Sequence, residues 1–320
     1  MHDLIIVGAG PAGMTAAVYA ARQKADTLLL SRDVGGQVNW TLGIENYMGY
    51  QFVEGLELIG KFEEQVRKFP INIEIGCEVR SLIRVHQGFE IEVAEGMKYQ
   101  GRTVIVCSGK RPKMLEVPGE ERLRGRGVTY CEVCDGPLFQ GMDVAIVGGG
   151  NSALEAAIDL EKVASRIYLA SLTPLTGDHI LREKVQEAGN VTVLTEHETL
   201  EIAGTESVSG IKIKDLRSGQ EKELKVQGVF VEIGLTPNSD FVRGLLTLNE
   251  FGEIMVNCSC ETSIPGLYAA GDVTNVPAKQ IVVAAGEGAK AAPSCLVVGG
   301  WRPVATYLGI KAVALEAAGY

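Results

Sequence analysis

The sequence has no long uninterrupted apolar run, few aromatic residues and no surplus of basic residues. Its apolar stretches are shorter than the ~18 residues that a membrane-spanning helix needs, so we expect no membrane partner. With 30 Lys and Arg against 40 Asp and Glu, the chain carries a net charge of −10, which disfavours binding to a phosphate backbone. Aromatic residues make up only 6%, too few for stacking along single-stranded nucleic acid. We therefore expect no nucleic-acid partner.

The features of a secreted, disulfide-rich protein are also missing. The chain starts without a basic region and cleavage site, so we expect no signal peptide and a cytoplasmic location. Seven cysteines are an odd number in a long chain, unlike a secreted disulfide framework. We expect most of them to be small buried apolar side chains.

The composition is that of a folded protein. Hydrophobic residues make up 46% and charged residues 22%, which excludes intrinsic disorder and allows a sizeable core. At roughly 100–200 residues per domain, a length of 320 residues suggests two domains. Glycine is abundant, with 39 residues, and many of them directly follow apolar runs.

The first such glycines belong to a strand–turn–helix–strand pattern. The apolar run Leu4–Val7 leads into Gly8-Ala9-Gly10-Pro11-Ala12-Gly13, a helical pattern over Met14–Arg22 and a strand pattern over Thr27–Leu30. Such glycines let the backbone approach a pyrophosphate, and the helix N-terminus offers N–H groups to it. The pattern predicts a dinucleotide site; the alternative is a tight turn without a ligand.

The same pattern returns in the second half of the chain. The run Val144–Val147 leads into Gly148-Gly149-Gly150-Asn151-Ser152-Ala153, a helical pattern over Leu154–Lys162 and a strand pattern over Ile167–Ala170. Ala replaces the third glycine, which the motif accepts. In this register Ser171 corresponds to Ser31 of the first copy. A second dinucleotide unit is predicted; the alternative is a nucleotide fold that has lost its ligand.

Further strands are expected around these units. Gly88–Val93 and Ile211–Lys214 alternate as in antiparallel strands and suggest a small antiparallel sheet inserted into each unit. A third strand-plus-glycine signal ends in Gly271-Asp272, followed by a helical pattern over Val283–Leu296. The tail from Gly300 has only a weak helix pattern. The expected fold class is α/β, with two Rossmann-like dinucleotide-binding domains.

Cys131-Glu132-Val133-Cys134-Asp135-Gly136 is the most informative stretch. CxxC spacing closes a small reducible disulfide, and it is also half of a zinc site. No second CxxC or paired His follows, although Cys258-x-Cys260 could complete four thiolates. We interpret the pair as a redox disulfide and expect no metal; a zinc site and plain structural cysteines are the alternatives. Asp135, beside the second thiol, is well placed to move a proton.

The order of these motifs, dinucleotide site, CxxC, dinucleotide site and Gly-Asp, describes a flavin–disulfide oxidoreductase. The sequence resembles the low-molecular-weight thioredoxin reductases and the reductase part of the alkyl hydroperoxide reductase flavoprotein. The resemblance runs from about Asp3 to Leu296. Besides the glycine motifs and the CxxC, it rests on Gly35-Gly36-Gln37, Ile44-Glu45-Asn46-Tyr47, Gly127-Val128-Thr129-Tyr130, Tyr268-Ala269-Ala270-Gly271-Asp272 and Lys279-Gln280-Ile281.

The resemblance implies FAD in the first domain. Residues 1–114 and 246–320 would form this FAD-binding domain, and 115–245 a NAD(P)-binding-like domain that carries the CxxC. The residues implied near the cofactor are Gly35, Gly36, Gln37, Thr41 and Asn46 along the flavin, Val79 near the adenine, Ser108 and Gly109 near the pyrophosphate, Gly271 and Asp272 at the ribityl or phosphate side, and Lys279, Gln280 and Ile281 by the isoalloxazine. Asn46 and Asn151 are alternatively turn residues, and Gln280 a surface amide.

The resemblance also implies the mechanism. Electrons would pass from a donor to FAD, then to Cys131–Cys134, and then to the disulfide of a protein substrate. Cys134 would lie nearest the flavin, Cys131 would attack the substrate, and Asp135 would act as general acid and base. Family members are homodimers, so a homodimer is expected. A ferredoxin-fed enzyme and a flavin-binding redox sensor are the alternatives.

One departure concerns the electron donor. NADPH-using relatives carry His-Arg-Arg where this chain reads Ser171-Leu172-Thr173-Pro174-Leu175-Thr176-Gly177, and the first cation after it is Arg182. The hydroperoxide-reductase relatives have Glu at the Ser171 position, which this chain also lacks. We expect NADH rather than NADPH, with ferredoxin as an alternative donor. A disulfide-carrier domain is absent from the sequence, so a separate thioredoxin or glutaredoxin-like protein is the expected acceptor.

Overall fold

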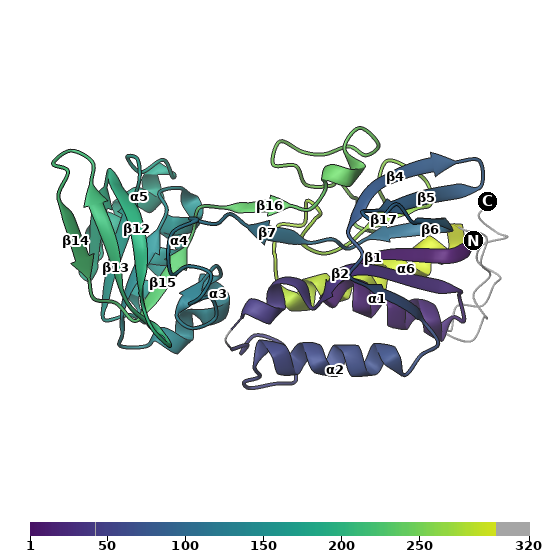
Figure 1. Cartoon of the computed structure of the whole chain (residues 1–320), viewed down its shortest axis with the longest axis horizontal. Helices are drawn as coiled ribbons and strands as arrows, with labels where there is room; N and C mark the ends of the chain where they lie inside the picture. The colour runs from purple at the N-terminus through teal and green to yellow at the C-terminus, as the bar shows by residue number, and fades with distance from the viewer. Residues whose placement is uncertain (42, 299–320) are drawn as a thin grey trace. The chain divides into compact units, whose positions relative to one another are not determined.

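The computed structural model describes residues 1–41 and 43–298, which form two compact units (Figure 1). Of the described residues, the first unit comprises 1–38, 56–111 and 236–298, and the second comprises 39–41, 43–55 and 112–235. The sequence predicts domain boundaries at 114/115 and 245/246 and assigns residues 39–55 to the first domain. In the structure the chain changes unit at 111/112 and 235/236, and the described residues of 39–55 group with the second unit. The predicted helix at Ala312–Ala318 lies outside the described residues.

Seven strands form the sheet of the first unit, in the order β3-β2-β1-β6-β5-β4 with β17 paired to β6. They are β1 (His2–Ala9), β2 (Thr27–Val34), β3 (Asn72–Ile75), β4 (Val79–Val85), β5 (Gly88–Val93), β6 (Lys98–Val106) and β17 (Leu267–Ala269). Strands β3, β2, β1, β6 and β17 run parallel. The apolar run of β1 is buried on both faces, as its lack of alternation indicates.

The antiparallel strands of the first unit are not a separate sheet, which corrects the expectation of a small inserted one. The second half of β6 pairs with β1, while its first half pairs antiparallel with β5. Strand β6 has nine residues, long enough to serve both ladders. The Gly88–Val93 alternation places Phe89 and Ile91 in the core, together with Ile5 of β1.

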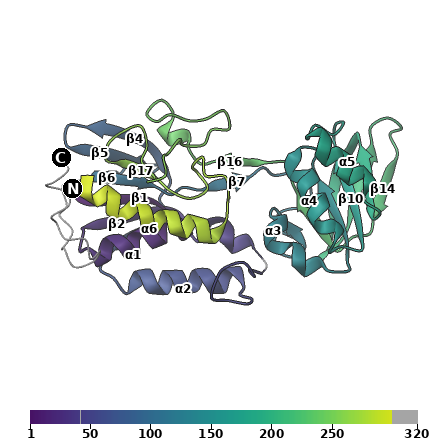
Figure 2. The ribbon, with the colours of Figure 1, turned by 180° about the vertical axis from the view of Figure 1, so that it is seen from behind.

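The described part of the first unit contains three α-helices: α1 (Pro11–Arg22), α2 (Gly55–Arg67) and α6 (Ile281–Val298). Helices α1 and α6 run along each other beside the sheet (Figure 2). Their approach depends on Gly288, where a Cβ would lie 2.0 Å from the Ala12 carbonyl oxygen. Short 3₁₀ helices occupy Gly36–Trp40 and Asp240–Val242.

The second unit has a parallel sheet of order β11-β10-β9-β15-β8 and a three-stranded antiparallel sheet. The parallel strands are β8 (Val128–Thr129), β9 (Asp143–Val147), β10 (Arg166–Ser171), β11 (Val191–Thr195) and β15 (Gly228–Val231). The antiparallel strands are β12 (His197–Gly204), β13 (Val208–Asp215) and β14 (Glu221–Leu224), and the helices are α3 (Glu132–Asp135), α4 (Asn151–Glu161) and α5 (His179–Glu187), with a 3₁₀ turn at Gly136–Phe139.

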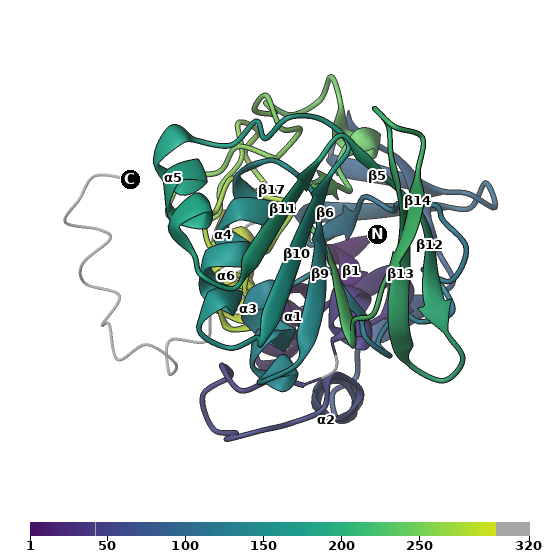
Figure 3. The same ribbon diagram turned by 90° about the vertical axis from the view of Figure 1, so that its left-hand side faces the viewer.

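Strand β9 lies between α4 and β13 (Figure 3), and its alternate residues belong to two different cores. Val144 and Ile146 pack with residues of α4, whereas Ala145 and Val147 pack with residues of β13. The α/β fold class with Rossmann-like units is confirmed. Two short strands, β7 (Lys110–Pro112) and β16 (Leu235–Pro237), pair with each other where the chain passes between the units. Among the described residues, no helix is long and apolar enough to cross a membrane.

Candidate active site

The first glycine motif forms a tight turn that is open on one side. A Cβ on Gly13 would lie 1.8 Å from the Gly8 carbonyl oxygen, and a Cβ on Gly8 would lie 2.3 Å from the Cys107 carbonyl oxygen. A Cβ on Gly10 would meet nothing within 4 Å, and no side chain caps the N-terminus of α1. The turn therefore leaves backbone N–H groups and space for a phosphate group.

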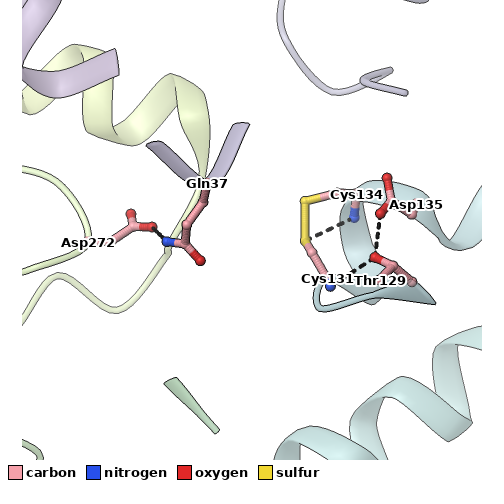
Figure 4. Close-up of a disulfide and its surroundings, with 6 residues drawn as sticks. All are labelled: Gln37, Thr129, Cys131, Cys134, Asp135 and Asp272. Carbon is pink, nitrogen blue, oxygen red and sulfur yellow. Dashed lines mark hydrogen bonds between the residues drawn. A yellow bond between two sulfur atoms is a disulfide. The ribbon is translucent and has the colours of Figure 1, made fainter. Parts of the chain in front are cut away.

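The structure brings the Gly271-Asp272 motif next to this turn. A Cβ on Gly271 would lie 3.0 Å from the Cβ of Ala12. Asp272 accepts a hydrogen bond of 3.4 Å from Nε2 of Gln37 (Figure 4). Burial raises the pKa of the Asp272 carboxyl above its ordinary value.

Glu287 of α6 is a site residue that sequence reasoning missed. Its Oε2 accepts a bond of 2.7 Å from the Gly271 backbone N–H, and its side chain is buried. A single glutamate in a helical pattern gives no signal, because its role depends on how α6 packs.

A second missed group surrounds Lys279. The Nζ atoms of Lys110 and Lys279 lie 2.6 Å and 3.0 Å from the same oxygen, Oε1 of Glu253. Asn249 donates to the other carboxylate oxygen at 2.6 Å. Burial lowers the pKa of the Lys279 ammonium group. Glu253 thus positions Lys279, which the resemblance implies beside the flavin.

Ser108 and Gly109 follow β6 and are bound to Asn238. Ser108 Oγ donates to the Asn238 carbonyl oxygen at 2.6 Å, and Asn238 Nδ2 donates to the Ser108 carbonyl oxygen at 2.8 Å. The Asn238 backbone N–H donates to the Gly109 carbonyl oxygen at 3.0 Å. Gly109 has a φ of +66°, with open space where a Cβ would be.

The remaining implied flavin residues lie on several segments. Gly35 and Gly36 follow β2 with positive φ, Val79 starts β4, and Ile281 starts α6 directly after Gln280. Val79 packs against the core of the first unit. Thr41 and Asn46 lie in segment 39–55, which groups with the second unit.

The second glycine motif repeats the geometry of the first. A Cβ on Gly148 would lie 2.2 Å from the Glu232 carbonyl oxygen and 3.0 Å from the Cβ of Ala153, which occupies the third motif position. Gly150 is open, and no side chain caps the N-terminus of α4, on which Asn151 and Ser152 are the first residues. This turn also fits a pyrophosphate.

The loop after β10 folds back onto this motif. Ser171 is buried, and its Oγ would lie 2.2 Å from a Cβ on Gly149. The backbone N–H groups of Thr176 and Gly177 donate to the Gly149 carbonyl oxygen at 2.7 Å and 3.2 Å. Ser171 therefore faces the glycine turn, and the loop Ser171–Gly177 offers no cation or carboxylate of its own for recognising a ribose.

Two polar residues flank this loop. The side chain of Asn151 donates to Asp178 Oδ2 at 3.2 Å and accepts from the Asp178 backbone N–H at 2.8 Å. Asn151 thus ties the loop to α4. Farther along α5, Nε of Arg182 is buried and has no hydrogen-bond partner in the described part of the chain.

The predicted disulfide between Cys131 and Cys134 is present (Figure 4). Cys131 is the N-cap of the four-residue helix α3, and its Sγ accepts a bond of 3.2 Å from the Cys134 backbone N–H. Both cysteines are half-buried.

Cys258 is exposed and Cys260 is buried. Within residues 1–41 and 43–298, no group of three or more His, Cys, Asp and Glu is arranged to hold a metal ion.

Asp135 lies next to the disulfide and is bound by Thr129. Both side chains are buried, with exposed fractions of 1% and 2%. Thr129 Oγ1 donates to Asp135 Oδ2 and accepts the Cys131 backbone N–H at 3.3 Å. Thr129 was not identified as a site residue from the sequence.

Two further carboxyls meet beside the disulfide. Glu132, between the cysteines, acts electrostatically on Glu232, which follows β15. Burial raises the pKa of Glu232 to about 9, and the charge of Glu132 acts in the same direction. Burial also raises the pKa of Glu132, aided by the charges of Asp159 and Glu155 on α4.

Comparisons with known proteins agree with this arrangement. Residues 2–288 match the model of a family described as pyridine nucleotide-disulphide oxidoreductase. The chain belongs to this family. Family members bind FAD and a pyridine nucleotide, and the two open glycine turns fit one dinucleotide in each unit. The chain is a flavoprotein of the thioredoxin reductase fold, and its disulfide fits a redox-active centre.

The individual relatives carry three different names. The chain is 44% identical over 293 residues to the F subunit of the alkyl hydroperoxide reductase of Pseudomonas putida, covering 90% of this chain and 56% of that protein. It is 41% identical to an NADH dehydrogenase of Bacillus subtilis, covering 91% and 57%. The chain thus spans little more than half of these relatives. The solved thioredoxin reductase of Streptococcus pyogenes matches with a TM-score of 0.88 and 35% identity, covering 93% of this chain and 98% of the other.

Proposed function

We propose that this protein is an FAD-dependent dithiol–disulfide oxidoreductase that reduces thioredoxin or a glutaredoxin-like protein. The observation that carries the proposal is the Cys131–Cys134 disulfide beside buried Asp135, in a unit with its own dinucleotide turn. The identity to hydroperoxide reductase proteins and the structural match to thioredoxin reductases support a protein disulfide as substrate.

The first unit would hold FAD. The Gly8–Gly13 turn and the α1 N-terminus would bind the pyrophosphate, with Asp272, Gln37 and Lys279 near the ribityl chain and ring. When bound, FAD supplies a carrier that accepts an electron pair from a donor and passes it to a disulfide. Gly10 keeps the turn open, because it places no side chain where the phosphates would lie.

The two cysteines then have different roles. The Cys134 N–H that reaches Cys131 Sγ would stabilise negative charge on that sulfur, so Cys131 is the attacking thiolate. It forms a bond with one substrate sulfur and displaces the other, which takes up a proton. Cys134 then attacks Cys131 Sγ, releases the second substrate thiol and restores the disulfide. Asp135 would accept the proton of the Cys134 thiol in this exchange and return a proton when the disulfide is reduced again, which takes two electrons and two protons.

The donor would be NADH rather than NADPH. A 2′-phosphate is usually bound by Arg or Lys, and the loop Ser171–Gly177 contains neither. This loop also lacks the carboxylate that binds the ribose hydroxyls of NADH, so we infer weak or slow NADH use. Because the loop lacks both the cation and the carboxylate that recognise a ribose, ferredoxin is the alternative donor.

Anaerobic titration of the purified protein tests the proposal. NADH, NADPH and reduced ferredoxin are added separately while flavin absorbance is followed, and turnover is then measured with thioredoxin and with a glutaredoxin-like protein. We expect about one FAD per chain, bleaching by NADH and turnover of a protein disulfide. A protein that is reduced but turns over neither acceptor contradicts the enzyme and favours a redox sensor.

A further inference from the structure

Thr129 connects the active-site turn to the carboxylate beside it. It lies on β8, which pairs with β15 through its backbone, so the pairing does not involve the hydroxyl. The hydroxyl instead accepts the Cys131 N–H and donates to Asp135 Oδ2 (Figure 4). The bond to Asp135 is buried, so water competes little with it, and the bond from Cys131 is partly buried.

The direction of these bonds is determined by chemistry. A backbone N–H only donates, so the Thr129 oxygen must accept from Cys131. The single hydroxyl hydrogen of Thr129 is then available to Asp135. The hydrogen bonds therefore run from Cys131 N–H through the Thr129 hydroxyl to the carboxylate. Movement of the Cys131 backbone and rotation of the Asp135 side chain are coupled through one oxygen atom.

We propose that Thr129 is a positioning residue, which holds the Asp135 carboxylate and the Cys131 backbone in the geometry needed for dithiol–disulfide exchange. The inference rests on the proposed function, in which Asp135 moves the proton during dithiol–disulfide exchange. Thr129 itself touches no reacting sulfur through its hydroxyl. Its effect on the rate must therefore pass through Asp135 and the Cys131 backbone.

A double-mutant cycle tests this role on the FAD-loaded protein. Wild type, Thr129→Val, Thr129→Ser, Asp135→Asn and the Val/Asn double variant are reduced with dithiothreitol under argon, desalted and mixed with Ellman's reagent in a single turnover. This assay needs no nucleotide and no protein acceptor. Valine keeps the β-branched shape that suits a strand but lacks the hydroxyl, whereas serine keeps the hydroxyl.

We expect Thr129→Val to slow thionitrobenzoate release by about 10- to 100-fold, as for loss of a hydrogen bond to a charged group. Thr129→Ser should stay within about threefold of wild type, and the double variant should be no slower than Asp135→Asn, because the two residues act as one unit. Melting curves and FAD content check the fold, and Thr129→Ala replaces valine if that variant does not fold.

Two results would overturn the inference while leaving the proposed function intact: a Thr129→Val protein as fast as wild type beside a slow Asp135→Asn protein, or effects of the two substitutions that multiply. An Asp135→Asn protein at wild-type rate would instead refute the role of Asp135 in the proposed function, and the inference with it.

Discussion

The carboxyl of Glu132 acts electrostatically on that of Glu232, although the two residues lie far apart in the sequence and no local pattern connects them. One lies inside the CxxC turn and the other follows the strand that neighbours the second glycine motif. Two interacting carboxyls that are largely removed from water do not both ionise easily. The pair therefore joins one residue of the CxxC turn to one whose backbone lies against Gly148 of the predicted nucleotide turn.

Glu232→Gln should make the stability of the protein less dependent on pH. The folded pKa of Glu232 is raised to about 9, so the folded protein keeps a proton that the unfolded chain releases above its ordinary carboxyl pKa. Wild-type stability should thus fall as pH rises through this window. We expect the variant to melt a few degrees higher than wild type at about pH 8 and similarly at about pH 4. Exposed Glu187 supplies the control, Glu187→Gln, and equal pH slopes for all three proteins would contradict the prediction.

Gly13→Ala should abolish tight FAD binding. The added Cβ would lie 1.8 Å from the Gly8 carbonyl oxygen, which forces the first turn and α1 apart. We expect less than about a tenth of the wild-type flavin content after reconstitution, a loss of at least ~1.4 kcal/mol in binding. The matched control is Gly60→Ala in α2, where a Cβ meets nothing within 4 Å. Normal flavin content in Gly13→Ala would refute a cofactor site at this turn.

Replacing each of the two active-site cysteines should block a different step of the reaction. Cys134→Ser leaves Cys131 able to attack a substrate disulfide but unable to resolve it, so it should trap thioredoxin as a mixed disulfide. Cys131→Ser should trap none and show a thiolate–flavin charge-transfer band, since Cys134 is the thiol assigned to the flavin. Non-reducing gels detect the mixed disulfide, and absorbance spectra detect the charge-transfer band. Cys258→Ser is the control and should keep full turnover. Trapping by Cys131→Ser would reverse the assignment.

NADPH should have no large advantage over NADH. Each charge-assisted contact to a 2′-phosphate is typically worth ~1.5–3 kcal/mol, or roughly tenfold to a hundredfold in affinity, and the Ser171–Gly177 loop supplies none. We expect kcat/KM values within about tenfold of each other at equal ionic strength. A hundredfold preference for NADPH would refute this and direct attention to Arg182, whose buried Nε has no partner within the described residues.

Local sequence patterns were sufficient to predict those features whose residues lie close together in the chain. The glycine turns, their flanking strands and helices, and the Cys131–Cys134 pair each involve residues within about one turn or one βαβ unit of each other. Spacing and periodicity determine such features before any tertiary contact forms. They were enough to predict the α/β fold class and the disulfide.

Only the tertiary structure decided which distant residues complete each site. Glu253 holds both Lys110 and Lys279, Glu287 binds Gly271, and Glu232 meets Glu132 because strand order and helix packing bring them together. The tertiary structure also determines that the Ser171 side chain faces Gly149. Single Glu, Lys and Ser residues carry no periodic signal, and their contacts depend on crossover connections and packing across a whole unit, which no short stretch of sequence encodes.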